Sequence, residues 1–355
     1  VELQLPVFLP DATRGLVRAV DSRDLEDCKI EAVVVNTLHL SSKPGISTVQ
    51  HHKGIHKLMS WDRPIISDSG GFQVFSMIYE SKIGSVNASG FTYKLDKGDK
   101  KRILTPEKCI QLQFQIGADI IYTLDYCTHP SMDDATQAQS IDYTIKWARA
   151  CKKEYERLLQ QKNDDFKRPL LFAVVQGGNS HELRKQCADA LLEIGFDGFG
   201  FGGWPIGDDG RLSEMVAYVS SLIPDSYPKH ALGIGKPENL VKAYDAGYNI
   251  FDCVIPSRDA RHKRLYAFNE PIKDYNTLLG GEFYSNIYIQ DEKYIKDTRP
   301  VDELCDCLTN DRYNRSYLNH LFDLNDHLAP RLATIHNLRF YSKLMEYIRE
   351  YGNKH

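Results

Sequence analysis

Eight short apolar runs recur along this chain with amphipathic stretches between them, and this alternation constrains the fold more than any other feature. The runs lie at residues 7 to 10, 32 to 36, 64 to 67, 119 to 124, 170 to 175, 198 to 201, 230 to 233 and 249 to 251. Most lack polar alternation, which is typical of strands buried on both faces of a parallel sheet. Helical periodicity lies between them, at residues 106 to 116, 140 to 161 and 180 to 195. Eight β/α units predict an α/β protein with a TIM (β/α)8 barrel, although doubly wound sheets share this alternation.

The residues that end these runs favour the barrel. A polar residue or a glycine follows six of the runs, namely Asp68, Asp125, Gln176, Gly203, Gly235 and Asp252. In a barrel the carboxyl ends of all strands meet at one face, and barrel enzymes keep their active sites there. The sequence therefore predicts a barrel whose functional residues follow its strands.

Two stretches break this rhythm and predict how the chain divides. Residues 79 to 103 are rich in Gly, Ser and Lys, which indicates a basic excursion, such as a hairpin, near a ligand. Residues 265 to 340 lose the alternation and contain a Cys-Asp-Cys motif, which indicates an inserted subdomain. We expect a barrel over residues 1 to 264, then this subdomain, then a C-terminal helix over residues 341 to 355 that packs on the barrel.

Composition and charge indicate a cytoplasmic protein. The 355 residues suffice for a large core, and 42% hydrophobic with 26% charged residues is typical of globular proteins. The eight cysteines are scattered, as expected for reduced thiols. No apolar run reaches membrane-spanning length and the first residues do not resemble a signal peptide, so we expect no membrane contact. Because the formal net charge is -4, contact with nucleic acid has to come from local basic patches.

Asp68 and Asp252 are the candidate catalytic residues. Each closes an apolar run, so each carboxylate is expected at the end of a strand. A nucleophile paired with an acid/base group is the minimum needed to exchange a glycosidic bond through a covalent intermediate. Residue type alone leaves open that Asp68 only caps a Gly-Gly turn and that Asp252 only forms hydrogen bonds at a strand end.

Seven motifs, in order along nearly the whole chain, give the sequence a specific resemblance. They are DSGGFQV at 68 to 74, DYCT at 125 to 128, VQGG at 175 to 178, GG at 202 to 203, GIGKP at 233 to 237, FDCVIPSR at 251 to 258 and TIHNLR at 334 to 339. This set resembles the bacterial-type tRNA-guanine transglycosylases, also called queuine tRNA-ribosyltransferases. The resemblance implies a barrel pentosyltransferase of queuosine biosynthesis that works as a homodimer.

The resemblance also implies a reaction. A transglycosylase of this family exchanges guanine at the anticodon wobble position of tRNA for a free 7-deazaguanine base. Asp252 would attack C1′ of the ribose and hold a covalent ribosyl intermediate while guanine leaves. Asp68 would protonate the departing base and then deprotonate the incoming one, and this reversal of roles agrees with microscopic reversibility.

A base-binding slot follows from the same resemblance. It places the guanine-like edge against Asp125, Gln176 and the backbone of Gly203, with the base between Phe72 and Leu232. Without the motifs, a glutamine at a strand end or a phenylalanine after a Gly-Gly pair would be read as ordinary structural residues.

The loop after Gly203 departs from the family pattern. Trp204 stands where the family has a small or aliphatic residue, and Pro205 stands where it has a backbone N–H. Because proline has no N–H, only the acceptor face of that peptide remains, with the Asp208 carboxylate nearby. Cys127 also resembles the residue found in relatives that take preQ1. Together these features predict that the incoming base is preQ1, which has a cationic aminomethyl arm, or queuine, and not preQ0, whose nitrile is neutral. The alternative is that Trp204 and Pro205 only make the loop rigid.

A metal site is implied, again with a departure. The family holds a structural zinc with three cysteines and a histidine; here Cys305, Cys307 and His336 are in register, but Asn310 occupies the third cysteine position. Zinc prefers four thiolate or imidazole ligands. We expect retained but weaker zinc. Two alternatives stay open: another side chain or water completes the site, or the subdomain holds no metal.

A basic segment directly follows Asp252. Arg258, Arg261 and Arg264 are expected to contact phosphates beside an extruded nucleotide, since an enzyme that acts on a base takes it out of its stack. A solvated basic loop is the alternative.

Other functions remain to be weighed against the transglycosylase. These are a non-catalytic tRNA-binding subunit of a heteromeric relative, an enzyme that inserts deazaguanine into DNA, and a barrel enzyme acting on small phosphates. The presence of both Asp68 and Asp252 argues against the non-catalytic subunit.

Overall fold

A computed structural model describes residues 3 to 81, 84 to 94 and 100 to 352 of the chain. Two compact units are distinguished by their internal packing. The first unit comprises Val1–Ala12, Leu16–Val33 and Gly233–His355, and the second comprises Thr13–Gly15 and Val34–Leu232.

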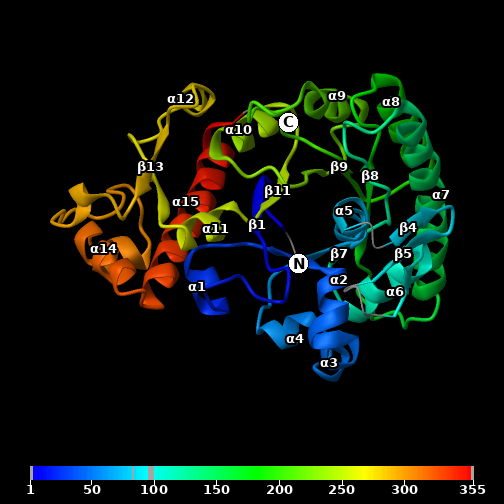
Figure 1. Ribbon diagram of the computed structural model, residues 1–355, viewed down its shortest axis with the longest axis horizontal. Helices are drawn as coiled ribbons and strands as arrows, with labels where there is room; N and C mark the ends of the chain where they lie inside the picture. The colour runs from blue at the N-terminus through cyan, green and yellow to red at the C-terminus, as the bar shows by residue number, and fades with distance from the viewer. Residues whose placement is uncertain (1–2, 82–83, 95–99, 353–355) are drawn as a thin grey trace. The chain divides into compact units, whose positions relative to one another are not determined.

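Eight strands coincide with the eight apolar runs (Figure 1). They are β1 (Val7–Pro10), β2 (Val33–Asn36), β3 (Ile65–Asp68), β7 (Ile120–Tyr122), β8 (Leu170–Val175), β9 (Gly198–Phe201), β10 (Lys229–Ala231) and β11 (Ile250–Cys253). Hydrogen bonding orders them as β1-β11-β10-β9-β8-β7-β3-β2. The first strand pairs in parallel with the last, which a barrel requires, whereas a doubly wound sheet places its first strand internally. The predicted TIM-barrel fold is therefore confirmed.

Helices pack in succession outside the strands of the second unit. Strands β3, β7, β8, β9 and β10 pair in parallel there. The helices α6 (Pro106–Ile116), α7 (Asp134–Leu159), α8 (His181–Ile194) and α9 (Glu214–Leu222) each contact the next. Helix α7 begins earlier than predicted, because Asp133 caps it by accepting from the Thr136 N–H at 2.7 Å. The first turns of α7 are polar, so apolar periodicity did not reveal them.

The predicted excursion forms an antiparallel sheet of β4 (Gly84–Asn87), β5 (Gly90–Tyr93) and β6 (Arg102–Leu104). Helix α5 (Gly71–Ser81) contacts β4 and β5. Lys100, Lys101 and Arg102 are exposed. The rest of the predicted basic stretch, at residues 82 to 83 and 95 to 99, lies outside the described residues.

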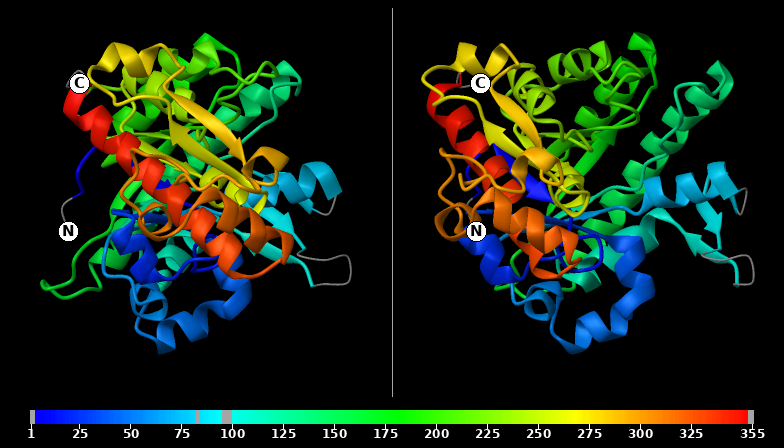
Figure 2. Two further views of the ribbon diagram at one scale, coloured as in Figure 1. Left: turned by 90° about the vertical axis from the view of Figure 1, so that its left-hand side faces the viewer. Right: turned by 60° about the vertical axis from the view of Figure 1, so that its left-hand side comes forward.

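In the first unit, a hairpin packs on the long helix α15 (Leu328–Tyr351). The hairpin strands are β12 (Arg264–Phe268) and β13 (Tyr284–Tyr288), and β12 contacts α15 (Figure 2, yellow and red). Helices α11 (Ile255–Arg261), α13 (Leu308–Arg312) and α14 (Arg315–Asp323) contact the same helix. The predicted division at residue 340 lies inside α15, which is continuous there, and the domain boundaries stay predictions.

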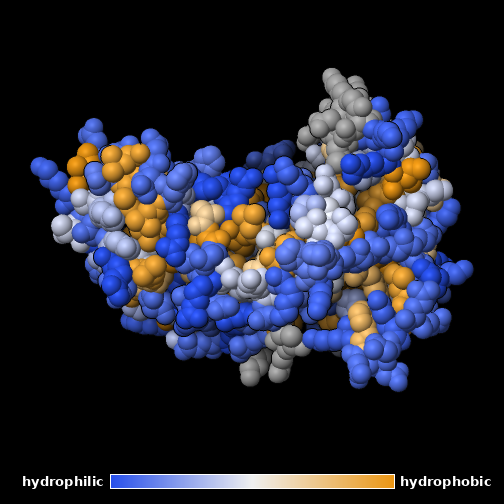
Figure 3. All heavy atoms as spheres, turned by 90° about the horizontal axis from the view of Figure 1, so that it is seen from below, coloured by the Kyte–Doolittle hydropathy of each residue, from blue (hydrophilic) through white to orange (hydrophobic). Residues whose placement is uncertain are grey.

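Shorter helices complete the described residues. They are α1 (Ser22–Asp27), α2 (Thr37–Leu40), η1 (Ser41–Gly45), α3 (Ile46–His51), α4 (Ile55–Met59), α10 (Pro237–Asp245), α12 (Tyr275–Leu279) and η2 (Glu292–Tyr294). None of the helices in the described ranges combines the length and the apolar character that crossing a bilayer demands. Hydrophilic residues cover most of the face drawn in Figure 3, with apolar areas scattered among them.

Candidate active site

Asp68 is the last residue of β3, and hydrogen bonds fix its carboxylate. Oδ1 accepts from the backbone N–H groups of Thr37 at 3.0 Å and Gly70 at 3.1 Å. Oδ2 accepts from Nδ2 of Asn36 at 2.5 Å and Nε2 of Gln73 at 3.2 Å. A carboxylate held by several N–H donors has a defined orientation. Asp68 is therefore positioned by residues from the ends of two strands, as its place in the sequence predicts.

Asn36 and Thr37 were not singled out from the sequence. Asn36 ends β2, and Thr37 follows it and also donates from Oγ1 to the Asp68 carbonyl. The signal that identified Asp68, a polar residue at the end of an apolar run, could have identified Asn36. It was missed because Asn36 was counted as the last member of its run.

Asp125 and Gln176 form a buried polar pair in the second unit. Nε2 of Gln176 donates to Oδ2 of Asp125 at 2.6 Å, and the Ser69 hydroxyl donates to Oδ1 at 3.3 Å. Asp125 is 7% exposed and Gln176 is 1% exposed. Burial raises the pKa of Asp125 to about 6. Oε1 of Gln176 is buried without a hydrogen-bond partner among the described residues, so the pair lacks a donor that a ligand could supply.

Gly202 and Gly203 allow Gln176 to lie where it does. A Cβ added to Gly202 would lie 2.4 Å from Nε2 of Gln176, so no side chain fits between them. Gly203 has φ +93°, a backbone conformation that glycine adopts most readily. The Gly-Gly motif thus has a steric reason at the end of β9.

Aromatic rings from three segments of the second unit gather around Trp204. Phe72, at the start of α5, is 50% exposed, and its ring centroid lies 5.8 Å from that of Trp204. Trp204 also contacts Phe75 at 6.2 Å and His129 at 4.9 Å, and His129 stacks on Tyr79 at 5.6 Å. Trp204 is therefore held by ring contacts to α5 and to the loop after β7.

The remaining predicted base-binding residues also lie in the second unit. Cys127 is buried, and its burial raises the pKa of the thiol, which is therefore neutral near pH 7. Leu232 follows β10 and covers Gly200, where an added Cβ would lie 3.0 Å from the leucine Cδ1. Asp208 is exposed in the loop whose base is the Ile206–Leu212 bridge.

Asp252 belongs to the first unit, where it lies near the end of β11. Its Oδ1 accepts from the backbone N–H of Gly233 at 3.0 Å, and it is partly exposed. A Cβ on Gly235 would lie 2.2 Å from Sγ of Cys253, so this glycine lets the loop after β10 approach β11 closely. Joint action of Asp252 and Asp68 on one substrate stays a prediction.

The three predicted RNA-binding arginines differ in their surroundings. Arg264 bonds to the buried carboxylate of Asp259, with its Nε at 2.9 Å from Oδ2. Arg261 donates to the carbonyl of Ser257 at 2.8 Å, and partial burial lowers its pKa. Arg258 has a side chain that is 49% exposed, so it is the most available of the three to an anionic ligand.

Cys305, Cys307 and His336 form a cluster that could hold a metal. Their ligand atoms lie within 4.8 Å of one another. Nε2 of His336 donates to the Tyr266 carbonyl at 2.6 Å, so Nδ1 is left to face Sγ of Cys307 at 3.6 Å. Two sulfur atoms and one imidazole nitrogen suit zinc, and they supply three of its four ligands.

Asn310, the fourth predicted position, is turned to the backbone. Its Nδ2 donates to the carbonyls of Asp302 and, at 3.1 Å, of Cys305. Its Oδ1 accepts from the Asp302 N–H at 3.4 Å. The amide therefore braces the loop that carries the cysteines and does not point to them as a ligand.

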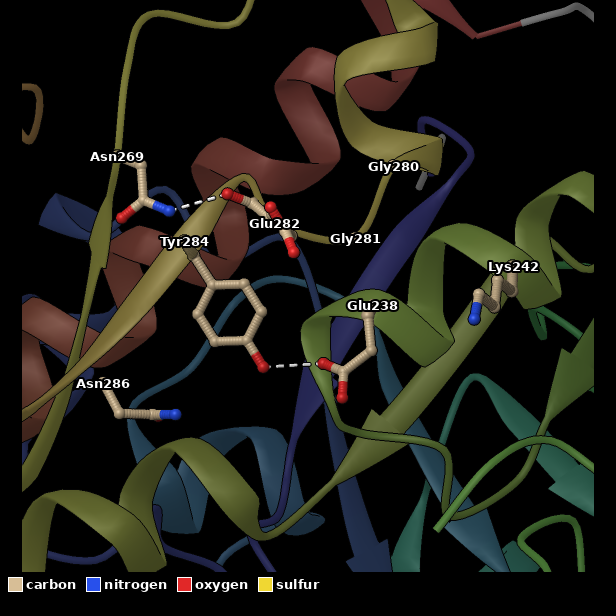
Figure 4. A pocket seen from close by; sticks show the side chains of 8 residues that line it. All are labelled: Glu238, Lys242, Asn269, Gly280, Gly281, Glu282, Tyr284 and Asn286. Atoms are coloured by element: carbon tan, nitrogen blue, oxygen red, sulfur yellow. Dashed lines mark hydrogen bonds between the residues drawn. The ribbon is translucent and has the colours of Figure 1, made fainter. Parts of the chain in front are cut away.

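A separate cavity of about 580 Å³ lies in the first unit, lined by Glu238, Lys242, Asn269, Gly280, Gly281, Glu282, Tyr284 and Asn286 (Figure 4). It contains none of the predicted site residues. Its polar groups bond to one another, as the Tyr284 hydroxyl donates to Glu238 at 2.6 Å and Asn269 donates to the Glu282 carbonyl at 2.6 Å. We do not assign it to the reaction.

Acidic and amide side chains at the carboxyl ends of barrel strands define the class of the protein as a (β/α)8-barrel enzyme. The sequence profile described as Queuine tRNA-ribosyltransferase matches residues 1–351. The chain belongs to this family.

Individual relatives agree with this assignment. A queuine tRNA-ribosyltransferase of Blochmanniella floridana is 36% identical over 98% of this chain and 86% of its own length. That of Caldanaerobacter subterraneus is 37% identical over the same shares. That of Acinetobacter baylyi is 34% identical over 98% of this chain and 84% of its own length. Similarity thus extends over almost the whole chain and most of each relative.

Proposed function

We propose that the chain is a tRNA-guanine transglycosylase that exchanges guanine at the anticodon wobble position for a free 7-deazaguanine base. Family membership supports the activity. The single observation that supports it best is the buried Asp125–Gln176 pair with an unpartnered amide oxygen. A 2-aminopyrimidinone ring presents adjacent N–H donors at one edge, and such donors would complete the hydrogen bonding of this pair.

In the proposed reaction, a carboxylate oxygen of Asp252 forms a bond to C1′ as the bond from C1′ to guanine N9 breaks. The electron pair of that bond goes to the guanine, which takes a proton from the carboxyl group of Asp68. In the second half, the Asp68 carboxylate takes the proton of the incoming base, and the nitrogen of that base forms a bond to C1′ as the bond from C1′ to Asp252 breaks. Each half-reaction conserves charge and needs no oxidant or reductant.

Label release from tRNA tests this proposal. We expect wild-type protein to release radiolabelled guanine from the wobble position, and Asp252→Ala and Asp68→Ala to lose this activity. A protein–RNA adduct that survives denaturation should form only where Asp252 is intact. Wild-type protein that binds tRNA without releasing label would instead support the non-catalytic subunit, and release from DNA alone would support the DNA enzyme.

The base is proposed to be preQ1. The Trp204–Pro205 peptide has no N–H to donate, so its carbonyl is the only polar group that it can offer to a substituent on C7. A carbonyl attracts the ammonium group of an aminomethyl arm and repels the nitrogen of a nitrile. Exchange assays with preQ1, queuine and preQ0 test this, and efficient incorporation of preQ0 would contradict it.

A structural zinc is proposed at Cys305, Cys307 and His336. When bound, it would cross-link the Cys-Asp-Cys loop to α15, on which His336 lies. Because Asn310 is engaged with the backbone, the proposed fourth ligand is a water molecule, which would make the metal exchangeable. The homodimer and the cytoplasmic location remain predictions of the resemblance; sedimentation at several protein concentrations would test the former.

A further inference from the structure

Arg184, on helix α8, is a fully buried cation that the reaction described above does not use. Its side chain is 1% exposed, and its guanidinium donates to three backbone carbonyls. Nη1 donates to Val175 at 2.6 Å and to Gly202 at 2.8 Å, and Nε donates to Gly178 at 2.9 Å. The three acceptors come from β8, from the loop after β8 and from the residue that follows β9.

These carbonyls lie directly beside the residues proposed to recognise the base. Val175 precedes Gln176 in the chain, and Gly202 precedes Gly203. A Cβ added to Gly203 would lie 3.4 Å from Nη2 of Arg184, so the guanidinium also limits the space behind this residue. One side chain thus fixes the ends of both strands that present the amide and the backbone of the base slot.

The cost of burying a cation indicates that this contact has a purpose beyond packing. An uncompensated buried charge is strongly unfavourable, whereas an apolar residue could join α8 to the sheet at no such cost. Arg184 is compensated by the carbonyls and by the ring of Phe201, whose centroid lies 4.5 Å from its Cζ. A planar guanidinium holds several acceptors in a fixed geometry, which the single ammonium of lysine cannot do.

We infer that Arg184 is a positioning residue for recognition of the incoming base. It holds Gln176 and Gly203 in the arrangement that fits the hydrogen-bonding edge of the ring. This inference rests on the proposed transglycosylase function, and it assigns no contact between Arg184 and the substrate.

The chain offers a matched control at the other ends of the same two strands. Arg168, before β8, donates from Nη1 and Nη2 to the carboxylate of Asp197, before β9, at 2.9 Å each. It also donates to the Tyr155 hydroxyl at 3.0 Å. Both arginines therefore tie β8 to β9, but Arg168 does so at the amino ends, away from the residues of the base slot.

The experiment compares Arg184→Lys with Arg168→Lys in the full chain. At saturating tRNA, we expect Arg184→Lys to raise the KM for preQ1 by about tenfold or more, as loss of charge-assisted hydrogen bonds around a binding group does. Its kcat should change less than about threefold and its KM for tRNA should not change. Arg168→Lys should lower the Tm but keep the KM for preQ1 within about twofold of wild type.

Calorimetric binding of preQ1 to free protein gives a second readout that does not depend on turnover. We expect weaker binding for Arg184→Lys and unchanged binding for Arg168→Lys. Equal binding by wild type and Arg184→Lys, or equal weakening in both variants, would overturn the inference. If wild-type protein neither exchanges guanine nor binds the base, the proposed function itself fails, which is a different result from a wild-type enzyme that Arg184→Lys does not impair.

Discussion

At the scale of single residues, the buried carboxyl of Asp125 makes a pH dependence of base binding expected. Its burial raises the pKa to about 6, and the ionised carboxylate accepts the N–H donors of a base more strongly than the neutral acid, one of whose oxygens carries a proton. Base affinity should therefore be full above pH 7 and should fall as the pH decreases through 6.

The same titration predicts an opposite trend for stability. Because the folded pKa lies above the ordinary value of 3.8, the folded state binds this proton more tightly, and Asp125 lowers stability as the pH rises from about 4 to 6. Calorimetry with preQ1 from pH 5 to 8, on wild type and Asp125→Asn, measures the first effect. An affinity that does not vary over this range in wild type would contradict the assignment.

Single residues also mark the limit of sequence reasoning about the site. The positions of Asp68, Asp125 and Gln176 at or after strand ends could be predicted because each follows an apolar run, whereas the base-binding roles of Asp125 and Gln176 came from the family resemblance and stay predictions. Arg184 could not be predicted, because it lies within a helical pattern where a charged residue is expected to face solvent. Its burial depends on where α8 packs, which is a tertiary property.

At the scale of elements, an ion pair between α1 and α15 is expected to contribute measurably to stability. Arg331 donates to both carboxylate oxygens of Asp24 at 2.9 and 2.6 Å, and the Asp24 side chain is only 6% exposed. Arg331→Ala would leave a buried carboxylate without this partner and should lower the free energy of unfolding by about 2 kcal/mol.

Arg23 on the same helix α1 provides the control. Its side chain is 77% exposed and its ion pairs with Glu26 and Asp27 are solvated, so Arg23→Ala should change the free energy of unfolding by less than about 0.5 kcal/mol. Urea denaturation of both variants measures the difference, and similar losses in the two would argue against a special role for the Asp24 contact.

The Cys-Asp-Cys loop and α15 give a prediction about metal binding. Asn310→Cys supplies a third sulfur, which makes four protein ligands with His336, and should slow zinc loss to a colorimetric chelator by about tenfold or more, because four protein ligands close the coordination shell. Asn325→Cys, in an exposed position outside the cluster, should release zinc as wild type does. Stoichiometric, chelator-resistant zinc in wild type would show that the site is complete without a third cysteine.

Most elements could be predicted from the sequence, and the differences have local causes. The strands of the barrel are buried on both faces, so each gives a continuous apolar run that stands out. The start of α7 and the continuity of α15 across residue 340 were missed, because neither depends on apolar periodicity. The start of α7 is set by the Asp133 cap. The continuity of α15 is set by packing against β12 and against the helices α1, α10, α11, α13 and α14.

At the scale of the whole molecule, the charge balance predicts how tRNA binding depends on salt. The formal net charge of -4 gives no overall attraction to RNA, so affinity has to come from local contacts such as the exposed Arg258. Arg258→Ala should weaken tRNA binding and make the slope of log K against log salt less negative by about 1.

Arg23→Ala, which makes the same change of net charge, should leave that slope unchanged. Filter binding of tRNA at several salt concentrations compares the two variants with wild type. Identical slopes for wild type and Arg258→Ala would remove Arg258 from the set of phosphate contacts.

The parallel pairing of β1 with β11 has a consequence for biosynthesis. Val7 pairs with Ile250, so β1 waits for a partner that is made roughly 240 residues later. At about 5 to 20 residues per second, that delay is on the order of 10 to 50 seconds. During this interval the apolar edge of β1 can pair with wrong partners. The exposure ends when β11, the strand that carries Asp252, has been synthesised and pairs with β1.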